Sequence, residues 1–335
     1  MFTLMKRSAI ALLAVVVAVL AIVACEKQAP GLTKVSLALD WYPNANHAGL
    51  FVAQQKGYFK AEGIEVNLYT PSDPSTVLQT VGAGKDDFGV SYQTDVLLAR
   101  AESIPVVSVA GMVQHPLNSV MALKSAGITR PRDLVGKKVG YPGIPYMVSL
   151  LKTMVEKDGG NFSKVEMVNV EFDLVPAILS KRVDAIVGGY WTHENLIIEQ
   201  QGQQVTVLRM EQWGVPDFYE LVLVANEKTL AQRPDVVRKL LRAMLKGYKD
   251  AAADQTAAVQ ALVQASPEVD KVLEDKGIRL LTPLWTDGVP SFGWQTAQRW
   301  KSYTDWLIAE HVVEKPVDVN KAFTNRFLEE VTQKP

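Results

Sequence analysis

The 335-residue chain has one cysteine and only four histidines. A single cysteine excludes a disulfide framework. The histidines stand far apart, at His47, His115, His193 and His311, which does not favour a zinc site. An excess of one charge is also missing, since 35 Lys and Arg residues face 36 Asp and Glu residues. Nucleic-acid-binding proteins normally carry a basic surface, so we expect no nucleic-acid partner.

Established catalytic and nucleotide-binding signatures are absent as well. The sequence contains no GxGxxG, Walker A, GxSxG or HExxH pattern. Residues 82–85 (GAGK) resemble part of a phosphate-binding loop but lack the full Walker spacing, so we interpret them as the start of a solvated turn. The sequence predicts no metal site and no nucleotide site.

The long hydrophobic run is confined to the N-terminus. Lys6 and Arg7 precede an unbroken apolar segment, residues 9–24, which is shorter than the roughly 20 residues that a membrane span prefers. The segment ends in Ile-Val-Ala-Cys25, which resembles a bacterial lipobox. We predict a lipoprotein signal peptide at 1–24, lipid (palmitate) on Cys25 and a tether at 25–32. This places the protein on the extracytoplasmic face of the cell membrane. The alternative is an uncleaved signal anchor.

After the tether, apolar strands alternate with helical patterns. Residues 35–39 (VSLAL) have the pattern of a strand and 48–56 that of a helix, and a second strand–helix series begins near Val120. From Pro234 onward the pattern is mostly helical, and its tryptophans are expected to pack in the core. The alternation predicts an α/β fold with parallel sheets covered on both faces. Such sheets bind ligands beyond the carboxyl ends of their strands.

The loops expected at those strand ends are rich in aromatic and polar residues. Four of them, 40–44 (DWYPN), 91–95 (SYQTD), 141–146 (YPGIPY) and 188–194 (GGYWTHE), each place Tyr or Trp beside a hydrogen-bonding side chain. Aromatic stacking contributes about 0.5–1.5 kcal/mol beyond area burial. These loops therefore favour a flat heterocyclic ligand.

At these loops the chain resembles a known family over almost its whole mature length. The matching segments are 40–45 with His47, 56–59 (KGYF), 91–93 with Asp95, 116–118 (PLN) and 139–145 (VGYPGIP). They resemble the thiamine-pyrimidine-precursor binding proteins, which are periplasmic or lipid-anchored components of ABC importers.

The resemblance implies a type II periplasmic-binding-protein fold, in which two α/β lobes are joined by two crossover strands. Lobe one would comprise 33–119 and 224–335, and lobe two 120–223. The implied partners are a small-molecule ligand in the cleft, a membrane permease and its ATPase subunit. The protein itself is expected to be a monomer.

The resemblance also supplies candidate ligand-binding residues. Tyr42, Tyr146 and Tyr190 or Trp191 would stack on the ring, and Trp41 would form the pocket floor. The expected polar contacts are Asn44, Asp95, Asn118 and Glu194. His47 and Tyr92 complete the set of predicted ligand-binding residues, although a histidine in such an apolar stretch is usually a buried histidine at a helix start.

A related enzyme offers an alternative from another class. The same superfamily contains a pyrimidine synthase that holds pyridoxal phosphate on a lysine and sacrifices a histidine. In the matching segment these fall on Ser91 and Asp95, and the enzyme's cysteine-rich patch is missing. We therefore predict a binding protein with no catalytic residues and no cofactor. A binding protein that serves a sensor rather than a permease remains a further alternative.

The ligand is predicted from one departure from the family pattern. Formylaminopyrimidine binders read GIPVNEP where this chain has GIPYMVS, so an amide and a carboxylate become Met147 and Val148, and Tyr146 is new. This change favours a larger, less basic ring, and riboflavin is the main hypothesis. The alternative is the thiamine precursor formylaminopyrimidine (N-formyl-4-amino-5-aminomethyl-2-methylpyrimidine). No arginine stands in the loops, so an unphosphorylated ligand is expected.

Overall fold

The structure, a computed structural model, describes residues 31–171 and 173–332. The predicted signal peptide, Cys25 and the tether up to residue 30 lie outside the described residues. The chain divides into two compact units, Met1–Thr33 and Lys34–Pro335, and the fold is that of the second unit.

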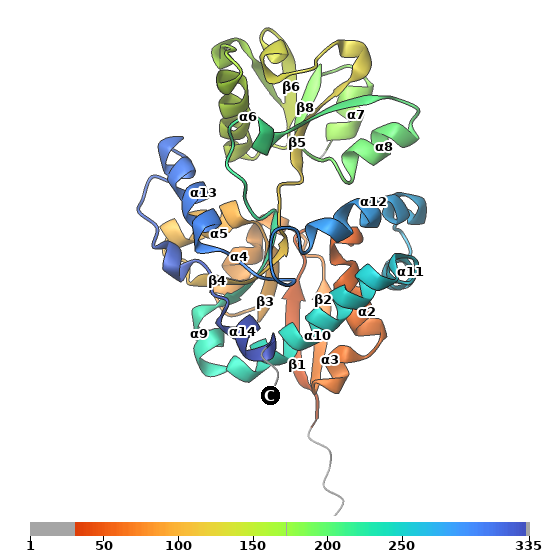
Figure 1. The fold of residues 1–335 in the computed structure, drawn as a ribbon, viewed down its shortest axis with the longest axis vertical. Coiled ribbons are helices and arrows are strands. Elements are labelled where there is room, and N and C mark those ends of the chain that lie inside the picture. The colour runs from red at the N-terminus through yellow and green to blue at the C-terminus, as the bar shows by residue number, and fades with distance from the viewer. Residues whose placement is uncertain (1–30, 172, 333–335) are drawn as a thin grey trace, which may run out of the picture. The chain divides into compact units, whose positions relative to one another are not determined.

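The second unit is built on two five-stranded sheets (Figure 1). The first sheet has the order β2-β1-β3-β10-β4 and the second the order β7-β6-β8-β5-β9. The strands of the first sheet are β1 (Thr33–Ala38), β2 (Ile64–Tyr69), β3 (Phe88–Ser91), β4 (Val106–Val113) and β10 (Leu221–Asn226). Those of the second are β5 (Asn118–Leu123), β6 (Lys138–Tyr141), β7 (Glu166–Asn169), β8 (Ala185–Tyr190) and β9 (Val205–Arg209).

Helices cover both faces of each sheet. In the second lobe, α6 lies on one side of the sheet and α7 and α8 on the other (Figure 1). These helices are α6 (Pro145–Lys157), α7 (Leu174–Leu179) and α8 (Glu194–Gln200). The first lobe carries α2 (Ala48–Gln55), α3 (Tyr58–Ala61), α4 (Val77–Gly82), α5 (Gln93–Ala101), α9 (Glu227–Gln232), α10 (Pro234–Ala253), α11 (Gln255–Ala265), α12 (Lys271–Leu284), α13 (Ala297–Ala309) and α14 (Arg326–Thr332). Short 3-10 helices are η1 (Ala45–His47), η2 (Pro74–Thr76), η3 (Lys124–Ala126), η4 (Pro131–Leu134), η5 (Phe162–Lys164), η6 (Met210–Gln212) and η7 (Val319–Lys321).

The prediction of two α/β lobes is confirmed, but the prediction of purely parallel sheets is wrong for β5 and β10. β1 pairs with β3, and β6 with β7 and β8, in parallel. β10 is antiparallel to β3 and β4, and β5 is antiparallel to β8 and β9. The chain leaves the first lobe through β4 and returns through β10, and it enters the second through β5 and leaves through β9. Neighbouring strands that exit and re-enter a lobe therefore run in opposite directions.

Two connections link the sheets in the part of the chain that the structure describes. The first crossover segment, residues 114–117, joins β4 to β5, and the second, residues 210–220, joins β9 to β10. We propose lobe boundaries at these segments, although β10 begins a few residues before the boundary at 224 that the sequence suggests.

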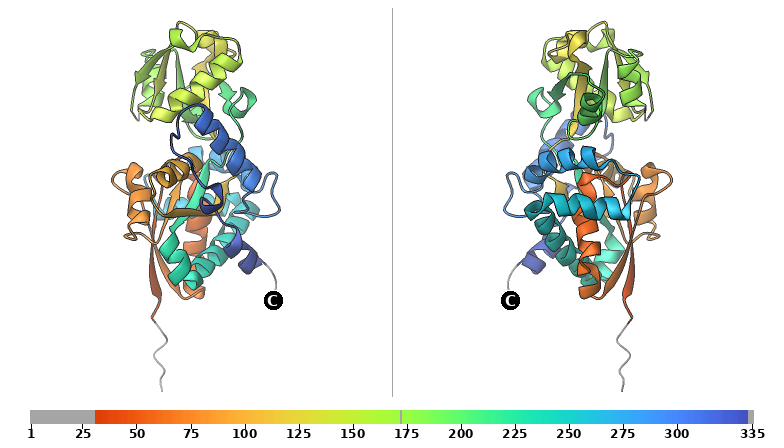
Figure 2. Two further views of the ribbon diagram at one scale, coloured as in Figure 1. Left: turned by 90° about the vertical axis from the view of Figure 1, so that its left-hand side faces the viewer. Right: turned by 90° about the vertical axis from the view of Figure 1, so that its right-hand side faces the viewer.

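The spacing of apolar residues explains the long helix α10. This helix packs across α2, as Figure 2 shows from two sides. Pro234 occupies its first turn, where a missing N–H costs nothing. Buried residues then recur every three or four positions, as in Val237, Leu240, Leu241, Met244 and Tyr248. Gly247 allows the two helices to approach closely, because a Cβ there would collide with the carbonyl oxygen of Gly49.

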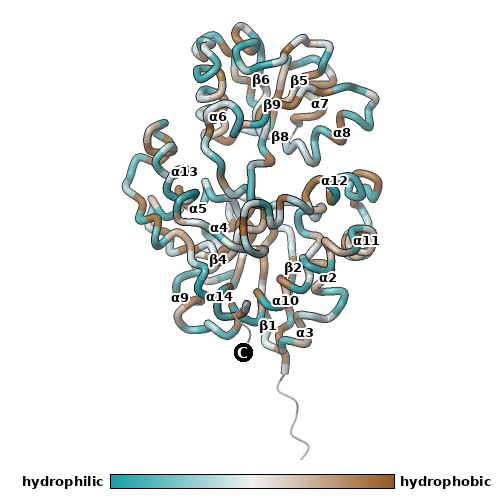
Figure 3. The backbone as a smooth tube through the Cα atoms, viewed as in Figure 1, coloured by the Kyte–Doolittle hydropathy of each residue, from teal (hydrophilic) through white to brown (hydrophobic). Residues whose placement is uncertain are grey.

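The central strands form the core. Every residue of β4 and β10 is buried, and Figure 3 shows the hydrophobic residues gathered on the inner strands. Trp285 and Trp300, which the sequence assigns to the core, are 2 % and 0 % exposed. Among the described residues, no helix combines the length and the apolar character that crossing a bilayer would require.

Candidate functional site

A cavity of about 460 Å³ lies where strand ends of both lobes converge. Its first-lobe wall comes from the loops after β1 and β3. Its second-lobe wall comes from the start of β5 and from the segments at and after the ends of β6, β7 and β8. The lining residues are Asp40, Trp41, Asn44, Asn46, Tyr92, Asn118, Pro142, Ile144, Tyr146, Met147, Glu171, Leu174, Val175, Pro176, Gly188, Tyr190, His193, Glu194 and Ile197.

Seven of the eleven predicted ligand-binding residues line this cavity. They are Trp41, Asn44, Tyr92, Asn118, Tyr146, Tyr190 and Glu194. Segments more than 150 residues apart in the sequence are thus brought together by the carboxyl ends of the parallel strands. The other four, Tyr42, His47, Asp95 and Trp191, do not line it.

His47 supports the cavity wall from behind. It is fully buried, and its Nε2 lies 2.8 Å from Oδ1 of Asp40, which does line the cavity. Nδ1 accepts the backbone N–H of Asn44 at 3.3 Å, which assigns the proton to Nε2. The other carboxylate oxygen of Asp40 accepts the Tyr92 hydroxyl at 2.9 Å. Asp40 is therefore held in one orientation from two sides.

Two asparagines follow in the same loop. Asn44 caps η1, with Oδ1 accepting the Asn46 N–H at 2.9 Å and Nδ2 donating to the Tyr42 carbonyl at 3.0 Å. Its side chain is thus occupied within the loop. Asn46 is 4 % exposed, and within the described part of the chain its Oδ1 has no hydrogen-bond partner. Sequence reasoning did not predict Asn46 as a site residue. The only signal for it was its position two residues after Asn44 in the same loop.

Tyr190 joins the cavity to the crossover segments. Its hydroxyl donates to Oε1 of Glu220 at 3.0 Å, and its backbone N–H donates to the Glu194 carboxylate at 2.7 Å. Burial, and then the charge of Glu220, hold the pKa of Tyr190 well above its ordinary value, so the hydroxyl stays protonated. Burial raises the pKa of Glu220 to about 7.

Tyr146 and the partly buried Asp95 form a second pair of titratable groups. Tyr146 lines the cavity and is 8 % exposed, and burial followed by the charge of Asp95 raises its pKa well above the ordinary value. Asp95 lies outside the lining, and burial raises its pKa to about 7. Asp95 therefore influences a residue of the cavity wall, Tyr146, without itself lining the cavity.

Tyr42 and Trp191 point elsewhere. Tyr42 is 69 % exposed and meets Trp41 edge-on, with 6.0 Å between ring centroids. Trp191 donates from Nε1 to the Pro116 carbonyl at 3.2 Å and carries the Arg209 guanidinium 4.6 Å above its ring. The hydrogen bond of Trp191 thus links the end of β8 to the first crossover segment.

The second-lobe wall is largely apolar and includes Met147, which the sequence comparison singled out, together with Ile144, Leu174 and Ile197, which sequence reasoning did not list as ligand-binding residues. The apolar pattern of these last three is that of ordinary core residues, so no signal marked them. Gly188 belongs to this wall with a φ of 101°, and a Cβ there would lie 3.0 Å from Pro142. Only glycine at position 188 lets β8 pass so close to the loop that contains Pro142.

The two lobes meet at the edge of the cavity. His193 of the second lobe has Nδ1 3.8 Å from Oε1 of Glu274 on α12. The other oxygen of Glu274 accepts the Ala45 N–H at 2.6 Å. Burial raises the pKa of Glu274. One carboxyl group therefore touches both the β1 loop and the loop that precedes α8.

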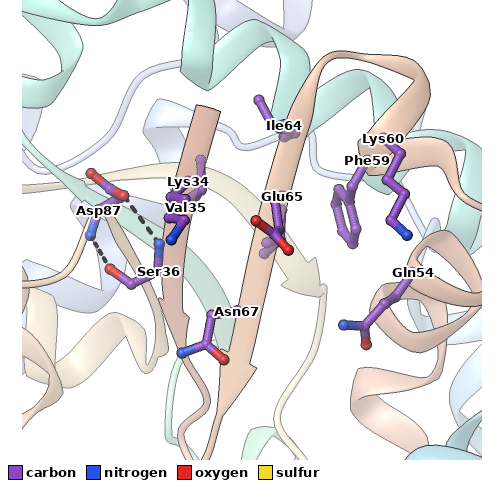
Figure 4. Close-up of a pocket in the computed structure, with 11 residues that line it drawn as sticks. Lys34, Val35, Ser36, Gln54, Phe59, Lys60, Ile64, Glu65, Asn67 and Asp87 are labelled. Carbon is purple, nitrogen blue, oxygen red and sulfur yellow. Dashed lines mark hydrogen bonds between the residues drawn. The ribbon is translucent and has the colours of Figure 1, made fainter. Parts of the chain in front are cut away.

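A second, larger cavity of about 710 Å³ lies along β1 and β2 (Figure 4). None of the predicted ligand-binding residues lines it. Two acidic residues, Glu65 and Asp87, line it, and Asp87 is already bound to Ser36 and to Arg233. Among the described residues, no group of three or more His, Cys, Asp or Glu side chains is placed to hold a metal ion.

The fold and the interlobe cavity define a two-lobed protein of the periplasmic-binding-protein class. The chain superposes on the periplasmic aliphatic sulphonate binding protein of Escherichia coli with a TM-score of 0.69 at 14 % identity, covering 90 % of this chain and 100 % of that one. This likeness establishes the type II fold that the resemblance implied.

The chain belongs to the family described as NMT1/THI5 like, which residues 44–258 match. It is 38 % identical to a formylaminopyrimidine-binding protein of Halalkalibacterium halodurans, over 88 % of this chain and 90 % of that protein. It is 29 % identical to a 4-amino-5-hydroxymethyl-2-methylpyrimidine phosphate synthase of Legionella pneumophila, over 88 % of this chain and 92 % of the enzyme.

Proposed function

We propose that this protein is the solute-binding component of an ABC importer and that it captures formylaminopyrimidine in the interlobe cavity. The observation that carries the proposal is the 38 % identity, over nearly the whole chain, to a protein named for binding that compound. The acceptor groups of the cavity support it, because Asp40, Asn46, Asn118, Glu171 and Glu194 suit a ligand with amino and amide N–H donors.

Riboflavin, the main hypothesis from the sequence, is not supported. It rested on Met147 and Val148 in place of a family amide and carboxylate, and on the new aromatic Tyr146. Tyr146 and Met147 line the cavity, whereas Val148, which replaces the carboxylate, does not. Three acidic residues from other segments, Asp40, Glu171 and Glu194, are among those that line the cavity. A basic aminopyrimidine therefore keeps its acidic partners, and the local substitution does not require a larger ring.

Binding without catalysis is part of the proposal. Ser91 and Asp95 stand where the resemblance places the lysine and histidine of the related synthase, and Ser91 is buried at the end of β3. Tyr146 and Tyr92 would stack on the ring while Asp40 and Asn118 fix its edge, and closure of the lobes would exclude water and strengthen each hydrogen bond.

Transport is tested in cells. A strain that lacks the gene should lose uptake of labelled formylaminopyrimidine but keep uptake of riboflavin, and the gene supplied on a plasmid should restore it. Unchanged uptake in the deletion strain would contradict the importer role and favour a sensor. Prolonged incubation of the purified protein with the ligand should return it unaltered by mass spectrometry, whereas a new product would indicate an enzyme.

The membrane anchor is proposed from the sequence alone. We propose that Cys25 carries lipid and holds the protein on the extracytoplasmic face, beside a permease and its ATPase subunit. Cys25→Ser should move the protein from the membrane fraction to the soluble extracytoplasmic fraction. Retention of the variant in membranes would instead support an uncleaved anchor.

A further inference from the structure

Asn118 has one amide atom in use and one without a partner. It begins β5, lines the cavity and is 3 % exposed. Its Nδ2 donates to Oε1 of Glu220 at 2.6 Å, whereas its Oδ1 has no hydrogen-bond partner among the residues that the structure describes. Buried acceptors are rarely left without a donor, and leaving one so is costly. A ligand in the cavity is the natural source of that donor.

Glu220 determines which amide atom remains. Its Oε2 accepts the backbone N–H groups of Leu117 and Asn118 at 2.7 and 3.0 Å. Its Oε1 accepts Nδ2 of Asn118 and the Tyr190 hydroxyl. An ionised carboxylate accepts four hydrogen bonds and donates none. The amide of Asn118 must therefore turn its NH₂ group toward Glu220 and its oxygen away.

We propose that Glu220 is a positioning residue for ligand selectivity: its carboxylate orients Asn118 so that this side chain offers an acceptor to a heterocycle with an exocyclic amino group. A heterocycle with an exocyclic oxo group at the same place would meet that acceptor with another acceptor. Glu220 does not line the cavity, so it acts through Asn118. The inference rests on the proposed function, from which it takes the aminopyrimidine ligand.

Glu220→Gln reverses the polarity of this contact. The amide oxygen of Gln can accept the two backbone N–H groups, which leaves its NH₂ group facing Asn118. Asn118 then turns its oxygen toward Gln, and its NH₂ group becomes the free donor. The Tyr190 hydroxyl can accept where it formerly donated. The variant should therefore prefer the oxo compound.

The test compares two ligands on two variants. Formylaminopyrimidine and its analogue with oxo in place of the 4-amino group are titrated calorimetrically at about pH 8.5, above the pKa of about 7 of Glu220. The wild type should bind the amino compound at least about tenfold more tightly, and Glu220→Gln should bind the oxo compound more tightly. Equal losses for both ligands, or an unchanged preference, would overturn the inference.

The matched control is Asp217→Asn. Asp217 lies on the same crossover segment and binds His115 and Arg299, each at 2.9 Å, but does not touch Asn118. Replacing its carboxylate by an amide should leave the preference as in the wild type. A reversed preference in this control would assign the effect to the crossover segment as a whole and overturn the role of Glu220.

A measurement without ligand separates this inference from the proposed function. The side-chain amide signal of Asn118, identified by its absence in Asn118→Ala, should shift in the NMR spectrum of Glu220→Gln and not in that of Asp217→Asn. An unshifted signal overturns the inference. A shifted signal in a protein that does not bind formylaminopyrimidine overturns the proposed function and supports the amide orientation.

If Glu220→Gln does not fold, the wild type provides the same comparison. Protonation of Glu220 below about pH 7 should shift the Asn118 amide signal as the substitution would. The hydroxyls of Tyr190, Tyr146 and Tyr303, which feel the charge of Glu220, have raised pKa values and stay protonated. Asp95 titrates in the same range, so the shift must persist in Asp95→Asn. A signal that does not move with pH overturns the inference.

Discussion

Two carboxyl groups with raised pKa values should make the protein less stable as the pH rises from about 5 to 7. Burial raises the pKa of Asp95 and of Glu220 to about 7, from ordinary values of 3.8 and 4.5. In this range the unfolded chain has lost both protons, whereas the native state keeps them. The native state therefore binds more protons, and by linkage the free energy of unfolding falls as the pH rises.

The magnitude follows from the shifts. One pKa unit corresponds to about 1.4 kcal/mol, so each group removes roughly 3–4 kcal/mol by the time it is fully ionised. The loss is complete above the native pKa and absent below the ordinary one. Carboxylates with lowered pKa values, such as Asp133, Asp158, Asp250 and Glu330, act in the opposite direction. Their stabilising contribution grows as the pH rises through acidic values and is fully present by about pH 5, so it is constant between about pH 5 and 7 and does not mask the fall.

Urea unfolding followed by tryptophan fluorescence, at intervals between about pH 5 and 8, measures this dependence. Asp95→Asn should remove one group's share of the fall, because the amide resembles the protonated acid. Asp305→Asn, at an exposed carboxylate on α13, should behave like the parent. Stability that is constant or rises over this range, or a fall that Asp95→Asn leaves intact, would refute the reasoning.

Three further substitutions test the site and its support. Tyr146→Ala should weaken the binding of formylaminopyrimidine at least about tenfold, as measured by calorimetry. The control Tyr42→Ala, at a ring that is 69 % exposed and outside the cavity, should leave binding unchanged. Equal effects of the two substitutions would contradict the placement of Tyr146 in the binding site. His47→Leu should lower the free energy of unfolding, measured in urea, by about 2 kcal/mol, because the buried Asp40 loses its hydrogen bond from His47. An unfolding midpoint equal to that of the parent would show that this hydrogen bond does not stabilise the fold. Gly247→Ala should lower the free energy of unfolding by roughly 3 kcal/mol or more in the same assay, because the added Cβ would collide with the Gly49 carbonyl. An unchanged free energy of unfolding would contradict the close packing of α10 on α2.

The sequence predicts the fold where one local signal decides the outcome. The helical pattern expected from Pro234 onward begins where α10 (Pro234–Ala253) begins, because proline and an uninterrupted apolar period mark this helix. The directions of β5 and β10 were not predictable from local pattern. These directions depend on which lobe the chain is entering. An apolar run such as that of β10 has the same sequence pattern whether the strand runs parallel or antiparallel to its neighbours.

The same distinction applies to the site. Aromatic and amide residues in loops after parallel strands were predictable, because the topology brings such loops together. The role of Glu220 was not, since a single carboxylate before an apolar strand carries no sign of its four partners. His47 shows the opposite failure, because a histidine beside a binding loop has the same sequence pattern whether it meets the ligand or a buried aspartate.

The central claim is that the interlobe cavity binds an aminopyrimidine and not a flavin. The most direct measurement is an equilibrium titration of protein beginning at Glu26, emptied of any ligand by unfolding and refolding, with formylaminopyrimidine and with riboflavin in parallel. The account predicts saturable binding of formylaminopyrimidine at one molecule per chain and no quenching of riboflavin fluorescence. Saturable quenching of riboflavin with no heat from formylaminopyrimidine would contradict it.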